Sequence, residues 1–264
     1  MKNSILLFIS FLLMLNCLTQ SLIAQTNDNQ LYAIRTIKVE PAKRVAYEKA
    51  LIAANAAFKA AKVSNLEYYV NVTNNYEYFA VVPIANMAEM DKSYWGEAIS
   101  KMGLEKFMQA VSPVEDNMSS SQLDVFLHCK DWDYEHPSLK DTQKGFRKWD
   151  AYQFKPGTSV QVEALMKEWL ALLKKKDIVR SQAFYKGVIG ANEGLIVSVI
   201  DAKDQVAYVQ ELSEFWNKVG AEGRVLWEKT ESLMVSLEER TGRFRPDLSM
   251  IPASVTKQMT AKEK

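Results

Sequence analysis

Residues 66–82 read LEYYVNVTNNYEYFAVV, and this stretch decides the expected class of fold. Two runs rich in β-branched and aromatic residues, Leu66–Val72 and Tyr76–Val82, flank Asn74 and Asn75. Asparagine tolerates the positive φ angles of a tight turn, so the pattern predicts a β-hairpin. Helical patterns precede and follow this hairpin, and we therefore expect an α+β fold.

The two faces of this hairpin differ in character if Asn74 and Asn75 form the turn, because cross-strand partners share a face. One face is almost entirely apolar and is expected to pack on helices: Leu66, Tyr68, Val70, Val72, Phe79 and Val81. The opposite face is mixed and rich in tyrosine: Glu67, Tyr69, Asn71, Tyr76, Tyr78, Ala80 and Val82. We expect the mixed face to line an interior space.

The chain also shows internal duplication. Three pairs of segments agree in order and spacing: residues 37–42 with 152–157, 101–103 with 218–220, and 134–139 with 244–248. Each copy reads as strand, helix, strand, strand, helix and a short irregular strand. We therefore predict two tandem ferredoxin-like βαββα(β) repeats, packed sheet to sheet as a pseudo-dimeric α/β barrel.

The helices of the two copies are indicated by apolar periodicity. In the first copy a helix is expected from Pro41 to about Ala61, and in the second copy an apolar stripe comprises Val162, Leu165, Met166, Trp169, Leu170 and Leu173. Residues 225–240 are expected to be a helical extension, with a less regular counterpart near residues 119–128. The predicted divisions are a signal peptide (1–24), a first repeat (25–140), a second repeat (141–248) and a C-terminal tail (249–264).

The element order, the duplication and the proline-containing strand ends resemble the dimeric α/β-barrel superfamily, which includes antibiotic-biosynthesis-type monooxygenases and NIPSNAP-like proteins. The resemblance spans most of residues 31–248 and rests on no catalytic motif, so it implies a fold rather than an activity. Some members bind haem through a histidine on the second helix, a role that we do not assign to His128. Others oxidise polycyclic phenols in an aromatic cavity without a cofactor, and no cofactor is expected here.

The first 24 residues have the layout of a cleaved secretory signal. Lys2 supplies a positive start, Ile5–Leu15 is apolar apart from one serine, and Ala24 is the expected residue before the cleavage point. We therefore expect an exported protein, either periplasmic or secreted. An uncleaved membrane anchor and a lipid attached to Cys17 are the alternatives.

Charge and cysteine content exclude several kinds of partner and site. The 264 residues carry 33 Lys and Arg against 32 Asp and Glu, so no basic field exists to attract nucleic acid. After cleavage only Cys129 would remain, and no intrachain disulfide could form. His128, Cys129 and His136 lie among acidic residues but match no metal-ligand spacing, so a polar loop is expected there. A nucleophilic Cys129 would lack an orienting third group.

An interior lined by the mixed face would hold a small hydrophobic or aromatic molecule. The candidate ligand-binding residues are Arg35, Tyr69, Asn71, Tyr78, Trp95, Phe184 and Trp216, although their aromatic members are also suited to core packing. Glu67 is the candidate catalytic residue, because a carboxylate enclosed in a barrel has a raised pKa unless an arginine pairs with it. We expect a ligand-binding protein. A cofactor-independent monooxygenase and a non-catalytic interaction or stress-associated module with a filled interior are the alternatives.

Overall fold

The structure is a computed structural model that describes residues 30–139 and 145–252. Its strands are β1 (Leu31–Lys38), β2 (Tyr69–Thr73), β3 (Glu77–Ile84), β4 (Ser120–His128), β5 (Tyr134–Glu135), β6 (Phe146–Phe154), β7 (Ser181–Ile189), β8 (Leu195–Ala202) and β9 (Met234–Phe244). Its α-helices are α2 (Arg44–Ala60), α3 (Gly96–Met102), α4 (Leu104–Glu115), α5 (Ser159–Lys175) and α6 (Gln205–Leu233). Short 3₁₀ helices include η2 (Met87–Asp91) and η5 (Pro246–Leu248).

Eight of these nine strands close into one antiparallel barrel. Their order around the ring is β4-β1-β3-β2-β9-β6-β8-β7, and β7 pairs with β4 to complete it. The short strand β5 pairs with the beginning of β7 beyond the end of β4. Each strand of the ring therefore has hydrogen-bonded neighbours on both sides, which removes the open edges that would otherwise invite aggregation.

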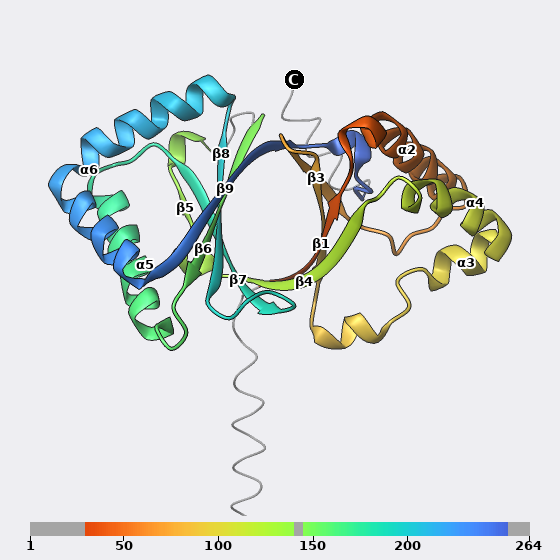
Figure 1. Cartoon of the computed structure of the whole chain (residues 1–264), viewed down its shortest axis with the longest axis horizontal. Coiled ribbons are helices and arrows are strands. Elements are labelled where there is room, and N and C mark those ends of the chain that lie inside the picture. Colours follow the sequence, from red (N-terminus) through yellow and green to blue (C-terminus); the bar gives the residue numbers. More distant parts are fainter. Residues whose placement is uncertain (1–29, 140–144, 253–264) are drawn as a thin grey trace, which may run out of the picture.

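Helices cover the barrel from outside on two opposite sides (Figure 1). On the first side α2, α3 and α4 pack on β1, β2 and β3, with Tyr47, Phe58 and Phe107 in their core. On the second side α5 and α6 pack on β6, β7 and β8, with Phe154 and Phe215 in theirs. The segment after β9 returns to the first side, where the fully buried Leu248 joins the first core.

The predicted pair of ferredoxin-like repeats packed sheet to sheet is wrong. The strands form one continuous barrel rather than two stacked sheets, because β2 pairs with β9 and β4 pairs with β7. Of these four strands, β4 and β9 fall in the two segments for which helix is the expectation. Residues 120–128 are strand β4, and α6 ends at Leu233, where β9 begins. Both strands carry many polar residues, so apolar periodicity alone does not identify them.

The predicted hairpin forms as β2 and β3, but its loop is one residue longer than expected. Tyr76 has a φ of 63° and joins the two asparagines in the loop, so Val72 pairs with Tyr78 and Asn71 with Phe79. Side chains alternate along a strand, and this shift by one residue moves every β3 side chain to the other face. Tyr78 therefore faces the helices, whereas Phe79 points into the barrel and packs edge-on against Trp149 of β6 at 5.3 Å.

The apolar stripe predicted around residues 162–173 is confirmed as α5, which buries most of that stripe. The signal peptide, the cleavage site at Ala24, the alternative at Cys17 and residues 253–264 of the tail lie outside the described residues. The predicted divisions of the chain stay predictions. None of the described helices has the length and apolar character needed to cross a membrane.

Candidate functional site

A pocket of about 300 Å³ lies between the outer face of the barrel and the helices of the first side. Its floor comes from the strands: Ala33, Arg35, Ile37, Val70, Tyr78, Ala80, Val82, Ile84 and Leu123. Its walls come from helices and loops: Tyr47, Leu51, Ala54, Phe58, Tyr68, Glu89, Met90, Lys92, Tyr94, Trp95, Val111, Val114, Glu115 and Met118. We call this space the first-side pocket.

Two alanines in the floor account for the space. In the β1–β3 register Ala80 lies opposite Arg35, and Ala33 lies opposite Val82. Protein interiors are packed closely, so a void arises where side chains are too short to meet the opposite layer. The methyl groups of Ala33 and Ala80 leave such a gap below α2 and α4.

The pocket walls are largely apolar and aromatic. Trp95 lines the pocket and lies 5.8 Å from Phe58, 5.0 Å from Tyr94 and 5.5 Å from Phe107, measured between ring centroids. Such contacts hold the rings in fixed orientations, and aromatic walls offer stacking surfaces to a flat ligand.

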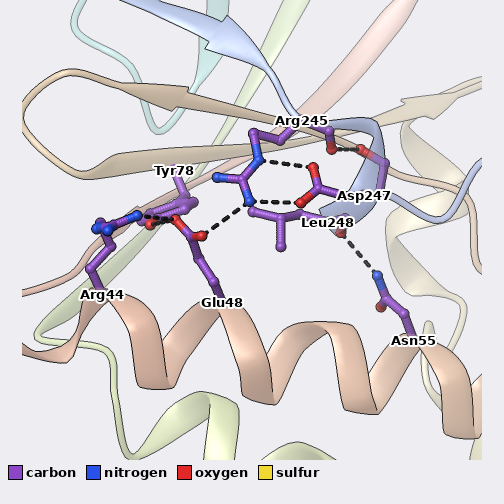
Figure 2. A network of polar contacts seen from close by, with 8 residues as sticks. Arg44, Glu48, Asn55, Tyr78, Arg245, Asp247 and Leu248 are labelled. Carbon is purple, nitrogen blue, oxygen red and sulfur yellow. Dashed lines mark hydrogen bonds and ion pairs between the residues drawn. The ribbon is translucent and has the colours of Figure 1, made fainter.

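A carboxylate network borders the pocket at Tyr78 (Figure 2). The Tyr78 hydroxyl donates to Glu48 Oε1 at 2.8 Å, and Arg245 Nη2 donates to Glu48 Oε2 at 3.0 Å. Arg245 also makes two bonds to Asp247, of 2.8 and 2.7 Å, and Arg44 lies 3.4 Å from Glu48. Burial raises the pKa of Glu48, but the bonds from Arg245 and Tyr78 outweigh it, so the pKa lies below its ordinary value.

The hydroxyl of Tyr94 is the unsatisfied polar group of this pocket. It is buried and finds no hydrogen-bond partner among the described residues, whereas the hydroxyls of Tyr68 and Tyr78 donate to Asn55 and Glu48. Burial, with a smaller contribution from the charge of Glu67, raises the pKa of Tyr94. The group therefore stays protonated at neutral pH and can donate to a ligand oxygen.

The structure brings some of the predicted site residues together and separates the others. Arg35, Tyr78 and Trp95 line the first-side pocket. Tyr69 and Asn71 lie on the opposite face of the sheet, where Asn71 accepts a bond of 2.8 Å from Arg147. Phe184 and Trp216 pack in the second core. The list of predicted positions is thus spread over three regions.

Glu67 lies in the loop before β2 and is not among the residues that line the pocket. Its carboxylate accepts a bond of 2.7 Å from the Tyr69 hydroxyl. The residues that sequence reasoning missed are Glu48, Tyr94, Arg245 and Ala33, while Ala80 is expected only as part of the mixed face. Glu48 and Arg245 are 197 positions apart, so no local pattern links them.

The histidines do not fit a haem held by a helix histidine. His128 ends strand β4, stacks on Tyr185 at 4.8 Å and lies 2.7 Å from Asp133. His136 lies outside the helices and contacts Asp177 at 3.0 Å. These are the two histidines of the chain, so α2 to α6 carry none that could bind iron.

Among the described residues, no three His, Cys, Asp or Glu side chains gather as a metal site. Cys129 is buried, and burial raises the pKa of its thiol to about 11. A reactive cysteine needs a lowered pKa, so this thiol is not prepared to act as a nucleophile.

Neither protein-family models nor curated protein sequences match the chain. Solved structures do share its fold. An anthrone oxidase-like protein gives a TM-score of 0.54 at 10% sequence identity, over 83% of this chain and 92% of that chain.

Two further solved structures reach a TM-score of 0.50, each at 9% identity. One is a protein from Lactobacillus acidophilus NCFM, provisionally named a monooxygenase, with 85% of this chain and 100% of that chain covered. The other is the chlorite dismutase of Candidatus Nitrospira defluvii in complex with imidazole, with 83% and 92% covered. At these identities the likeness concerns the fold alone. The chain therefore shares its fold with proteins named as a monooxygenase, an anthrone oxidase-like protein and a chlorite dismutase.

Proposed function

We propose that the protein binds a small aromatic or hydrophobic molecule in the first-side pocket. The observation that carries this proposal is an apolar space of about 300 Å³ whose wall holds the unpartnered hydroxyl of Tyr94. Small-molecule sites are typically apolar pockets with a few well-placed polar groups. The ligand would then lie between the barrel and its helices, rather than between two stacked sheets.

The chemistry of the walls suggests the shape of the ligand. A flat bicyclic molecule would lie against Trp95 and Phe58, and an oxygen on its ring would accept a hydrogen bond from the Tyr94 hydroxyl. An unsatisfied buried hydroxyl costs about 1–3 kcal/mol, which such an acceptor would recover. A naphthol or a naphthoquinone has these features.

Calorimetric titration with 1-naphthol tests the proposal. Ala80→Leu places a larger side chain in the pocket and should weaken binding about tenfold or more, while leaving the fold intact. Ala56→Leu is the matched control, because Ala56 is exposed on α2 and does not line the pocket. Equal affinity in the Ala80→Leu protein would contradict the proposed location.

A second candidate function is cofactor-independent oxidation of the bound molecule. It is favoured by the Tyr94 donor, which could hold the oxygen of an anthrone-like substrate, and by the shared fold with the anthrone oxidase-like protein. In that reaction the substrate CH₂ becomes a carbonyl, with one atom of O₂ entering the product and the other leaving as water. Oxygen uptake with anthrone that Tyr94→Phe lowers would support it, and no uptake above the protein-free rate would exclude it.

We also propose that the chain is exported and loses residues 1–24. The argument is the signal-like order of a positive start, an apolar stretch and Ala24 before the expected cleavage point. N-terminal sequencing of the protein from a bacterial host tests this. We expect Gln25 as the first residue of the periplasmic or secreted form, and an intact leader on all of the protein would contradict it.

A further inference from the structure

On the second side of the barrel, the helices cover polar groups where the first side has a pocket. Asp150 of β6 lies opposite Ser198 of β8, and both are buried. Arg180 precedes β7, and Glu211 lies on α6 one turn before Phe215. We call Asp150, Arg180, Ser198 and Glu211 the second-side cluster.

Arg180 is buried without a counter-ion in contact. The residue is only 9% exposed. Its guanidinium forms no ion pair or side-chain hydrogen bond among the described residues. The ring of Phe215 lies 4.7 Å from the guanidinium carbon and covers its face. The N–H groups at the edge of a guanidinium covered in this way remain available to a ligand.

Two buried oxygens of the cluster also lack a well-formed hydrogen bond within the described structure: Ser198 Oγ, which has the Tyr152 hydroxyl beside it, and Glu211 Oε2. Asp150 Oδ1 is satisfied by the Lys148 ammonium, which lies 3.0 Å away and forms an ion pair with it. Burial raises the pKa of both Asp150 and Glu211. Donors and acceptors are therefore both left unused in one buried region, which is costly unless a third molecule joins them.

The charges of the cluster indicate what such a molecule would carry. Lys148 contacts Asp150 and also Glu239, so those carboxylates share a cation. Arg180 and Glu211 remain. Their opposite charges attract each other, but no ion pair joins the two side chains among the described residues. A simple anion would satisfy Arg180 but add negative charge beside two carboxylates, whereas a molecule with one charge of each sign would leave the balance unchanged.

We propose that the second-side cluster binds a small zwitterion of the amino-acid class. Its carboxylate would receive the N–H groups of Arg180, its ammonium group would donate to Glu211, and Ser198 would donate to the carboxylate. Planar carboxylates suit the guanidinium edge, which can make two parallel bonds to them. This site is independent of the first-side pocket and of any ligand bound there.

Thermal unfolding of the full protein with glycine, acetate or methylammonium distinguishes binding of a zwitterion from binding of a simple anion or a simple cation. We expect glycine at ten times its Kd to raise the Tm by about 4 °C, and the two single-charge compounds at the same concentration to have no comparable effect. No shift with glycine, or an equal shift with acetate alone, would overturn the proposal.

Substitutions test whether the rise in Tm with glycine arises from binding at the second-side cluster. Arg180→Met should abolish the glycine shift, whereas Arg224→Met, at an exposed position of α6, should retain it. If Arg180→Met does not fold, Ser198→Ala gives the second test, because Ser198 is fully buried and alanine is smaller. It should weaken glycine binding about fivefold. An unchanged response in Arg180→Met or in Ser198→Ala would contradict the assignment.

Discussion

The two helix-covered sides of the barrel bury their polar groups in opposite ways. On the first side, Glu48 is contacted by Tyr78 at 2.8 Å, by Arg245 at 3.0 Å and by Arg44 at 3.4 Å. On the second side, Arg180 has no ion pair in the described part of the chain, and Glu211 Oε2 lacks a hydrogen bond. One side is a paired network beside an apolar pocket, whereas the other, within the described residues, leaves an arginine without an ion pair beside a carboxylate with a free oxygen.

This difference arises from the strand residues below the helices rather than from the architecture. The first floor contributes the alanines at positions 33 and 80, which leave space, while its charged groups stand at the border. The second floor contributes Asp150 and Ser198, which place polar atoms under α6. The ligands that we propose for the two sides therefore differ in chemistry although the surrounding architecture is the same.

The largest effect on stability is expected where β2 pairs with β9, because this pairing joins the two sides of the barrel. Gly242 of β9 lies so close to β2 that an added Cβ would stand 2.0 Å from the carbonyl oxygen of Val72. Gly242→Val should lower the free energy of unfolding by about 3 kcal/mol, because backbone atoms must move apart. Urea denaturation measures this.

Ser236→Val is the control for that substitution, since Ser236 is exposed on the same strand. Its stability should stay within about 0.5 kcal/mol of the wild type. Equal stability of both variants would mean that β2 and β9 are not held together as described.

Removing the ion pair between Arg245 and Glu48, which we call the Glu48 clamp, should have the next largest effect on stability. Arg245→Ala leaves a mostly buried carboxylate without its main cation and should cost about 2 kcal/mol in unfolding free energy. Arg243→Ala, at an exposed position two residues earlier, should change stability little. Chemical denaturation at pH 7 compares the two, and equal losses would contradict the importance of the clamp.

The Glu48 clamp also predicts that the stability of the protein depends on pH. Because the pKa of Glu48 is lower in the folded protein than its ordinary value of 4.5, the carboxylate favours folding above that pH. This contribution is lost as the pH falls below 4.5 and through the folded-state pKa. Denaturation between pH 7 and pH 3 should show a smaller acid-dependent loss in Arg245→Ala than in the wild type. An identical pH profile for both proteins would refute this.

The smallest effect is expected from removing the unpartnered hydroxyl in the first-side pocket. Tyr94→Phe should leave stability unchanged or raise it by up to about 1 kcal/mol, because the hydroxyl has no partner to lose. Tyr68→Phe should instead cost about 1 kcal/mol, since its hydroxyl donates to Asn55. Thermal and urea unfolding compare them. A loss in Tyr94→Phe as large as that in Tyr68→Phe would show that Tyr94 has a partner.

Local patterns explain which parts of the fold could be predicted from the sequence. The hairpin at residues 66–82 and the stripe of α5 are visible because neighbouring residues determine them. Strands β4 and β9 are not visible in this way, because distant backbones hold them and their side chains are largely polar. The closure of the barrel depends on those two strands.

The candidate site was harder to predict for a related reason. A single residue, Tyr76 with its positive φ, shifts the register of β3 and turns Tyr78 and Ala80 from the barrel interior toward the helices. The register shift therefore puts the first-side pocket on the helix-facing side of the sheet, where Arg35, Tyr78 and Trp95 line it. Glu48 and Arg245 meet only through the folded chain.

The location of the ligand can be measured directly by NMR of the protein labelled with ¹³C at the methionine methyl groups. Met90 and Met118 line the first-side pocket, whereas Met166 lies in the second core. Titration with 1-naphthol should shift the methyl signals of Met90 and Met118 through the ring current of the ligand and leave that of Met166 unchanged. A shift of Met166 alone, or no shift at Met90 and Met118 with ligand in excess, would contradict a binding site between β1, β3 and the helices of the first side.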